Sequence, residues 1–151
     1  MAANNAISRL LEGIEASLLT SPVNALRLGL HPGGLAPRIA NFAEWRAHLL
    51  ARLRRQIDIT GDPVLVGLLE EIGDYPGPDS ANSDVPLRYR EYADVVVPLQ
   101  LVIKGGVLSL FSMTTVFGTP VDITLSELAV ESFLPADAAT AEALHRLAAA
   151  A

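Results

Sequence analysis

The chain has 151 residues, no cysteine, 50% hydrophobic residues, 19% charged residues and a formal net charge of -6. This length is enough for one domain with a real core, and the absence of cysteine excludes disulfides, zinc–thiolate sites and thiol catalysis. The acidic balance excludes a stand-alone DNA-binding protein, because nonspecific affinity for phosphates needs a surplus of Lys and Arg. No apolar run is long enough to span a membrane and the N-terminus does not read as a secretory signal, so we expect a cytoplasmic protein without a membrane partner.

The first half of the chain is predicted to be helical. Asn4 or Asn5 caps a first helix with one apolar stripe at helical spacing. Asn24 to Leu30 is predicted to form a second short helix, which the cluster His31-Pro32-Gly33-Gly34 ends. The stripe of the first helix consists of Ile7, Leu10, Leu11, Ile14 and Leu18.

The longest predicted helix runs from Pro37 to about Thr60, with Gly61 as its stop. Asp62 caps a further helix that runs from Pro63 to about Ile72, and the Pro- and Gly-rich stretch from Gly73 to Asp84 is predicted to be a mobile loop. The core face of the long helix is predicted to carry Ile39, Phe42, Leu49, Leu50, Leu53 and Ile57.

The second half of the chain is predicted to form an antiparallel sheet. Apolar residues alternate over Val95 to Ile103 and again over Val107 to Phe117, on either side of Gly105-Gly106, which predicts a hairpin. Pro98 makes the first of these an edge strand or marks a bulge.

The stretch from Glu127 to Leu134 has two interpretations. Thr124 and Glu127 have the spacing of a helix capping box, whereas the residues from Leu128 onward alternate as in a strand. We favour the strand, because three antiparallel strands make a usable sheet and two do not. Asp137 then caps a C-terminal helix, so the sequence predicts a single α+β domain.

The sequence carries no recognisable catalytic or metal-binding motif. The three histidines, His31, His48 and His145, lie in different predicted elements, and no pair has the spacing of metal ligands. There is no nucleophile elbow and no phosphate-binding glycine loop. We therefore expect no enzyme activity, no metal and no cofactor.

One stripe of the long helix is the first candidate for a binding surface. Asn41, Trp45, His48 and Arg52 lie beside the core face, with Arg55 on the same line. One interpretation is a solvated helix flank with Trp45 folded over the edge of the core. The other is the wall of a ligand cavity between this helix and the sheet, with an apolar surface from Trp45 and a polar head group oriented by His48 or Arg52.

The central strand supplies the opposite wall of this candidate cavity. Its Ser and Thr residues stand where a dry core would normally hold Val or Ile, while most of the strand is plain core. Phe111, Met113, Thr115 and Phe117 share one face of this strand, and Thr114 lies on the other. The predicted ligand-binding residues are Asn41, Trp45, His48, Arg52, Phe111, Met113, Thr114 and Phe117.

Three long stretches carry a family resemblance. Asn24 to Pro32, Asn41 to Arg55 and Phe117 to Asp137 are similar, in this order, to the C-terminal ligand-binding domain of MmyB-like transcription regulators. Those are bacterial XRE-family regulators that read DNA with a separate N-terminal helix-turn-helix. The resemblance implies a PAS-like antiparallel sheet packed against helices and a small-molecule effector of the fatty-acid type.

The chain departs from the family pattern at its N-terminus. The helix-turn-helix is absent, and so is the strand-rich segment that runs into a stretch like Ala2-Ala3-Asn4. We therefore expect a truncated form, a single PAS-like domain over residues 1–151 whose sheet lacks its first strand or strands. DNA is then a partner only through a helix-turn-helix missing from this chain, and the exposed sheet edge predicts a homodimer.

Two alternative functions remain open at this point. The first is a dimerisation or interaction module with a filled core. A cavity in the structure would favour a ligand-binding domain, and a tightly packed core would favour this module. The second is a small α+β enzyme, which requires a buried carboxylate or histidine facing a pocket. Its carboxylate candidates near the sheet are Asp122, Glu127 and Glu131.

Overall fold

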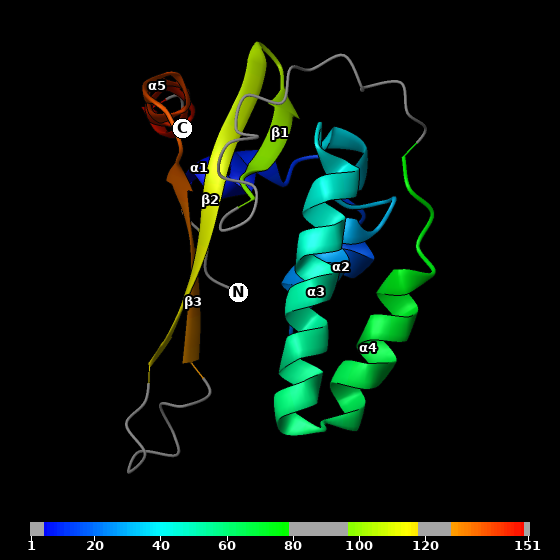
Figure 1. Cartoon of the computed structure of the whole chain (residues 1–151). Helices are drawn as coiled ribbons and strands as arrows, with labels where there is room; N and C mark the ends of the chain where they lie inside the picture. The colour runs from blue at the N-terminus through cyan, green and yellow to red at the C-terminus, as the bar shows by residue number, and fades with distance from the viewer. Residues whose placement is uncertain (1–4, 79–96, 118–127, 150–151) are drawn as a thin grey trace.

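A computed structural model describes residues 5–78, 97–117 and 128–149; for residue 5 and for the strand segments 114–117 and 128–131 it gives the backbone alone. Helices and a three-stranded antiparallel sheet confirm the predicted α+β class (Figure 1). The α-helices are α1 (Asn5–Leu10), α2 (Ala25–Leu30), α3 (Phe42–Thr60), α4 (Pro63–Gly73) and α5 (Ala138–Ala149), the 3-10 helices are η1 (Ala16–Leu19) and η2 (Ala36–Arg38), and the strands are β1 (Leu99–Ile103), β2 (Gly106–Phe117) and β3 (Leu128–Pro135).

Three helices begin at a residue whose side chain caps the first turn, and two of these caps, Asp62 and Asp137, are the predicted ones. Asn24 Oδ1 accepts hydrogen bonds from the backbone N–H groups of residues 26 and 27, at 3.0 and 3.1 Å. Asp62 Oδ1 accepts from Val64 N at 2.8 Å and Asp137 Oδ1 accepts from Thr140 N at 2.7 Å. Each bond satisfies a donor that the first helical turn leaves without a partner. The end of α3 also follows the prediction, since Gly61 has a left-handed φ of 63°.

The first helix is shorter than the apolar stripe predicts. α1 ends at Leu10, a turn with Gly13 at φ 80° follows, and the chain resumes as the separate helix η1. The prediction of one helix reaching Leu18 is therefore wrong. Glu15 N donates to Gly33 O at 3.0 Å, so a contact with the loop after α2 holds this segment away from a continuous helix.

The start of the long helix differs from the prediction for a related reason. Residues 36–38 form η2, and α3 begins at Phe42. Ile39 instead forms an antiparallel bridge with Leu101, and Ala40 N donates to Gln100 O at 2.8 Å. Pairing with β1 thus replaces the first helical turn that Pro37 suggested, a case of tertiary contact overriding local propensity.

The sheet has the strand order β1-β2-β3 with antiparallel pairing throughout. Ile103 pairs with Gly106, which confirms the predicted hairpin. Its two-residue turn is Lys104-Gly105, one residue earlier than the predicted Gly105-Gly106, and Gly106 is the first residue of β2. β3 pairs with β2 from Pro135 opposite Leu110 to Leu128 opposite Phe117, so the strand interpretation of this stretch is confirmed. β1 is an outer strand that begins directly after Pro98, in agreement with the predicted edge position; residues 95–96 lie outside the described part.

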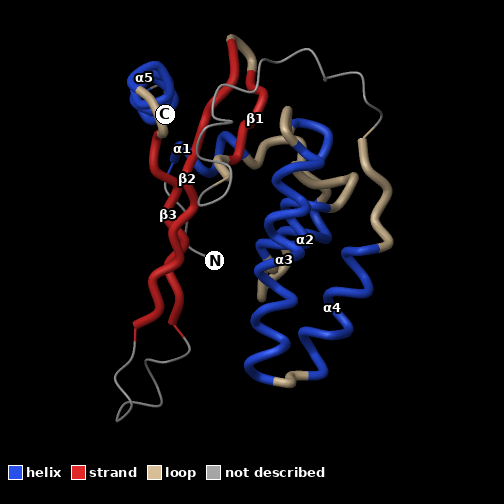
Figure 2. Tube along the Cα trace, in the orientation of Figure 1, coloured by secondary structure: helices blue, strands red, loops and turns tan. Residues whose placement is uncertain are grey.

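The helices lie on two sides of the sheet (Figures 1 and 2). α1 and α5 lie on one side, while α2, α3 and α4 gather beyond the β1 edge, with α4 beside α3. β2 and β3 continue past β1 as a two-stranded ribbon. The buried core joins both groups of helices to the sheet and consists of Leu10, Leu30, Ala36, Ile39, Phe42, Trp45, Leu53, Leu68, Ile72, Leu99, Leu101, Leu108 and Leu110.

Candidate functional site

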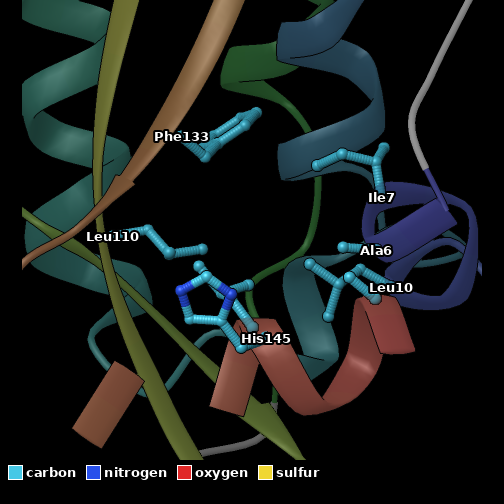
Figure 3. A pocket seen from close by; sticks show the side chains of 8 residues that line it. Ala6, Ile7, Leu10, Leu110, Phe133 and His145 are labelled. Atoms are coloured by element: carbon cyan, nitrogen blue, oxygen red, sulfur yellow. The ribbon is translucent and has the colours of Figure 1, made fainter. Parts of the chain in front are cut away.

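A half-open cavity of about 220 Å³ lies between α1, α5 and the sheet (Figure 3). Leu110 of β2 and Phe133 of β3 form its floor on one sheet face, since Ser112, two residues after Leu110, pairs with Phe133. His145 is the ionisable side chain among its lining residues, and Figure 3 shows its ring beside Leu110. We call this cavity the apolar pocket; it is lined by Ala6, Ile7, Leu10, Leu110, Phe133, Leu144, His145 and Ala148.

A second hollow of about 570 Å³ adjoins the first. The two share Leu10 as a lining residue, and α5 supplies Leu147 to the second. Its character differs, because three cationic side chains and one carboxylate line it. We call this hollow the basic pocket; it is lined by Arg9, Leu10, Glu12, Arg38, Val102, Ile103, Lys104 and Leu147.

Asn41 and Trp45, two of the predicted ligand-binding residues, have structural partners. The buried Asn41 side chain donates from Nδ2 to Pro98 O at 2.8 Å and accepts at Oδ1 from Gln100 N at 3.0 Å. The Trp45 ring packs on α2 so closely that a Cβ at Gly29 would lie 2.9 Å from Trp45 Cη2. Asn41 therefore joins α3 to β1, and Trp45 joins α3 to α2.

His48 and Arg52 lie farther along the same face of α3. His48 is half-buried, and burial together with the nearby charges of Arg52 and Arg55 lowers the pKa of its imidazole. Arg52 is exposed. The neutral imidazole is therefore favoured, and the cationic character of this stripe comes from the arginines.

The predicted residues of the central strand fall into two groups. Phe111 is half-buried, and Met113 on the same face is 51% exposed. Thr114 pairs with Glu131 and Phe117 with Leu128 along the ribbon, and the positions of these side chains lie outside the described part of the structure. Neither described pocket includes a residue of the predicted set, so a cavity between α3 and the sheet stays a prediction.

The sequence analysis did not predict the site between α1 and α5. The apolar residues of both terminal helices suggested ordinary core stripes, and the two helices stand at opposite ends of the chain. A usable signal lies in Ala6 and Ala148, because small residues on the facing sides of two helices leave unfilled space. Only the tertiary contact between α1 and α5 shows that these residues face one another.

A cluster of titratable side chains joins α2 to α4. Arg27 makes two hydrogen bonds to Glu71, Nε to Oε1 at 2.8 Å and Nη2 to Oε2 at 2.6 Å, and the Tyr75 hydroxyl also donates to Oε1. The bond to Arg27, then that to Tyr75, lowers the pKa of Glu71 to about 2, and burial raises the pKa of Tyr75 to about 12. Neither value is near neutrality, so this cluster is suited to holding the two helices together and not to proton transfer.

Replacing Glu71 with glutamine should change the acid stability of the domain. The pKa of Glu71 falls from an ordinary 4.5 to about 2 in the folded chain, so its stabilising effect is present above pH 4.5 and is lost as the pH falls toward 2. We expect the difference in free energy of unfolding between wild type and Glu71→Gln to shrink over this window in urea titrations. Glu70→Gln, at the exposed neighbouring position, is the control. A difference that is constant with pH would contradict the assignment.

Within the described residues, no group of three or more His, Asp or Glu side chains is placed to hold a metal ion. Likewise, none of the helices there is both long enough and apolar enough to cross a membrane.

Neither the curated proteins nor the solved structures contain a match to the chain. Residues 1–147 match the family described as the MmyB-like transcription regulator ligand binding domain. The chain therefore belongs to the family of MmyB-like transcription regulator ligand-binding domains.

Proposed function

We propose that this domain is the sensor of an XRE-family transcription regulator and that its effector is a small, largely apolar molecule of the fatty-acid type. The effector would control DNA binding by the regulator's helix-turn-helix. The observation that carries the proposal is the apolar pocket between α1, α5 and the sheet, in a chain that belongs to a ligand-binding family. Apolar lining with few polar groups is typical of small-molecule sites.

Two locations for the effector are compatible with this function. The apolar pocket is the one that the described cavities favour. The other is the space between α3 and the sheet, where His48 and Arg52 would meet the polar end of the ligand. The two locations use different residues, so variants distinguish them.

Decanoate is a suitable probe for the proposed effector. A ligand that binds only the folded domain stabilises it, by roughly 2.7 kcal/mol at a hundredfold excess over its Kd, so it should raise Tm. Ala148→Leu places a larger side chain in the apolar pocket and should reduce the increase in Tm. Ala51→Leu, at an exposed position of α3, is the matched control. If His48→Ala abolishes the increase and Ala148→Leu does not, the α3 location is correct.

Native mass spectrometry of the purified domain shows whether a small molecule is bound and how many copies of the chain associate. A bound small molecule is the expected result, and its absence together with an unchanged Tm in decanoate would contradict the proposed function. We also propose a homodimer that forms through the outer edge of β3. Residues 39–41 cover the outer edge of β1, whereas no described residue pairs with the outer edge of β3. A monomer mass at low concentration would contradict the dimer.

A further inference from the structure

The basic pocket reverses the charge balance of the chain. The sequence has 17 acidic residues and 11 lysines and arginines, yet the lining of this pocket has three cations, Arg9, Arg38 and Lys104, against the single carboxylate of Glu12. Lys104 is the only lysine in the sequence and lies in the turn between β1 and β2. A local surplus of positive charge on an acidic domain favours anions at this place.

Arg38 is the cation of this pocket with the most constrained surroundings. Its half-buried side chain donates from Nη1 to Leu10 O at 2.7 Å and from Nε to Val102 O at 3.5 Å. Both acceptors are neutral backbone carbonyls, and no ion pair between Arg38 and a carboxylate is present in the described residues. A guanidinium held by dipoles alone gains a charge-assisted hydrogen bond when an anion approaches.

The same part of α1 lines both pockets. Leu10 lines both, and its own carbonyl is the group that holds Arg38. On the other wall, α5 gives Leu144 and Ala148 to the apolar pocket and Leu147 to the basic pocket. One molecule spanning the two would have an apolar chain at one end and an anionic group at the other.

We propose that the basic pocket binds the anionic head group of the effector, with Arg38 as the main contact and Lys104 as a second one, while the apolar pocket binds its chain. The ligand class is an amphiphile with one anionic group, a carboxylate or a phosphate monoester. This inference rests on the proposed function, because it takes the apolar pocket as the effector site. It adds the groups that select for the head group.

Four ligands that each have a chain of ten carbon atoms separate charge from apolar binding. They are decanoate, decyl phosphate, decanol and decyltrimethylammonium, titrated calorimetrically below their micelle concentrations. We expect decanoate or decyl phosphate to bind about tenfold more tightly than decanol, an advantage that added salt reduces, and the cation to bind least. The tighter of the two anions identifies the head group.

Equal affinities for decanoate, decyl phosphate and decanol would overturn the head-group assignment and leave the proposed function intact. Failure of all four ligands to bind would contradict the proposed function itself. Stronger binding of decyltrimethylammonium than of decanol would also overturn the assignment. The outcomes for the anion site and for the apolar site are thus distinct.

Variants then test the two cations. Arg38→Met should weaken decanoate binding about tenfold and leave decanol binding unchanged. Because this change also removes the bond to the Leu10 carbonyl, Lys104→Gln at the exposed turn provides a second test, with an expected loss of about threefold. Arg54→Gln, which removes one positive charge from exposed α3, should have no effect.

His145 is the competing head-group contact, because it lines the apolar pocket. If His145→Gln removes the preference for decanoate over decanol while Lys104→Gln and Arg38→Met retain it, the basic pocket is not the anion site. Retention of the preference in His145→Gln, with its loss in the other two variants, supports the proposal.

Discussion

Replacing Gly34 with alanine should destabilise the domain by about 3 kcal/mol or more. Gly34 is buried in the loop after α2, and a Cβ there would lie 2.2 Å from Leu28 O and 3.1 Å from the Leu28 carbonyl carbon. This oxygen is fixed, because Leu35 N donates to it at 2.9 Å. The clash is with backbone and not with a flexible side chain, so relief requires the loop to move and this hydrogen bond to break.

Gly67→Ala is the matched control for this prediction. Gly67 lies inside α4 at an exposed position, and a Cβ there would meet nothing within 4 Å. Alanine has the higher helix propensity, so this variant should be more stable than wild type by roughly 0.5–1 kcal/mol. Urea titrations of both variants measure the two free energies of unfolding. Similar effects of the two substitutions would show that the packing at Gly34 is looser than the structure has it.

The elements that the sequence predicts well are those whose signals are local. Asn24, Asp62 and Asp137 each cap the helix that follows, and Gly61 ends α3, because these effects depend on residues within one turn. For β3 the local signals conflict, because a capping box competes with the strand pattern, and the need of a sheet for a third strand favours the strand. Here a constraint from the whole fold, applied to the sequence, gave the right answer.

The elements that the sequence does not predict depend on distant partners. Residues 39–41 leave the helix because Leu101 and Gln100, about sixty positions later in the chain, offer backbone groups to pair with. Trp45 does not lie on an exposed polar stripe. Its ring is buried against α2, because Gly29 has no side chain at the place where the ring packs. The two pockets need α1 and α5 together, and nothing in either segment alone shows that they meet.

Replacing Asn41 with alanine should cost about 2–4 kcal/mol of stability, the other large effect that we expect. Its amide donates to Pro98 O, just before β1, and accepts from Gln100 N of β1, and it is only 5% exposed. Alanine leaves Pro98 O and Gln100 N buried without this partner, which costs more than the loss of an exposed hydrogen bond. The measurement is again the free energy of unfolding.

Asn24→Ala separates this buried bridge from an ordinary helix cap. Asn24 also uses its side-chain oxygen on backbone N–H groups, but at the half-exposed start of α2, so its loss should cost only about 1 kcal/mol. Hydrogen exchange gives a second, local readout: in Asn41→Ala the amide of Gln100 loses its acceptor and should exchange faster, whereas in Asn24→Ala it should not. Equal stability losses and an unchanged Gln100 amide would mean that the strand pairing of Ile39 and Ala40 alone holds α3 to the sheet. If the Gln100 amide does exchange faster, the side chain of Asn41 is a fixed part of that junction, and a ligand that engages it must first displace β1.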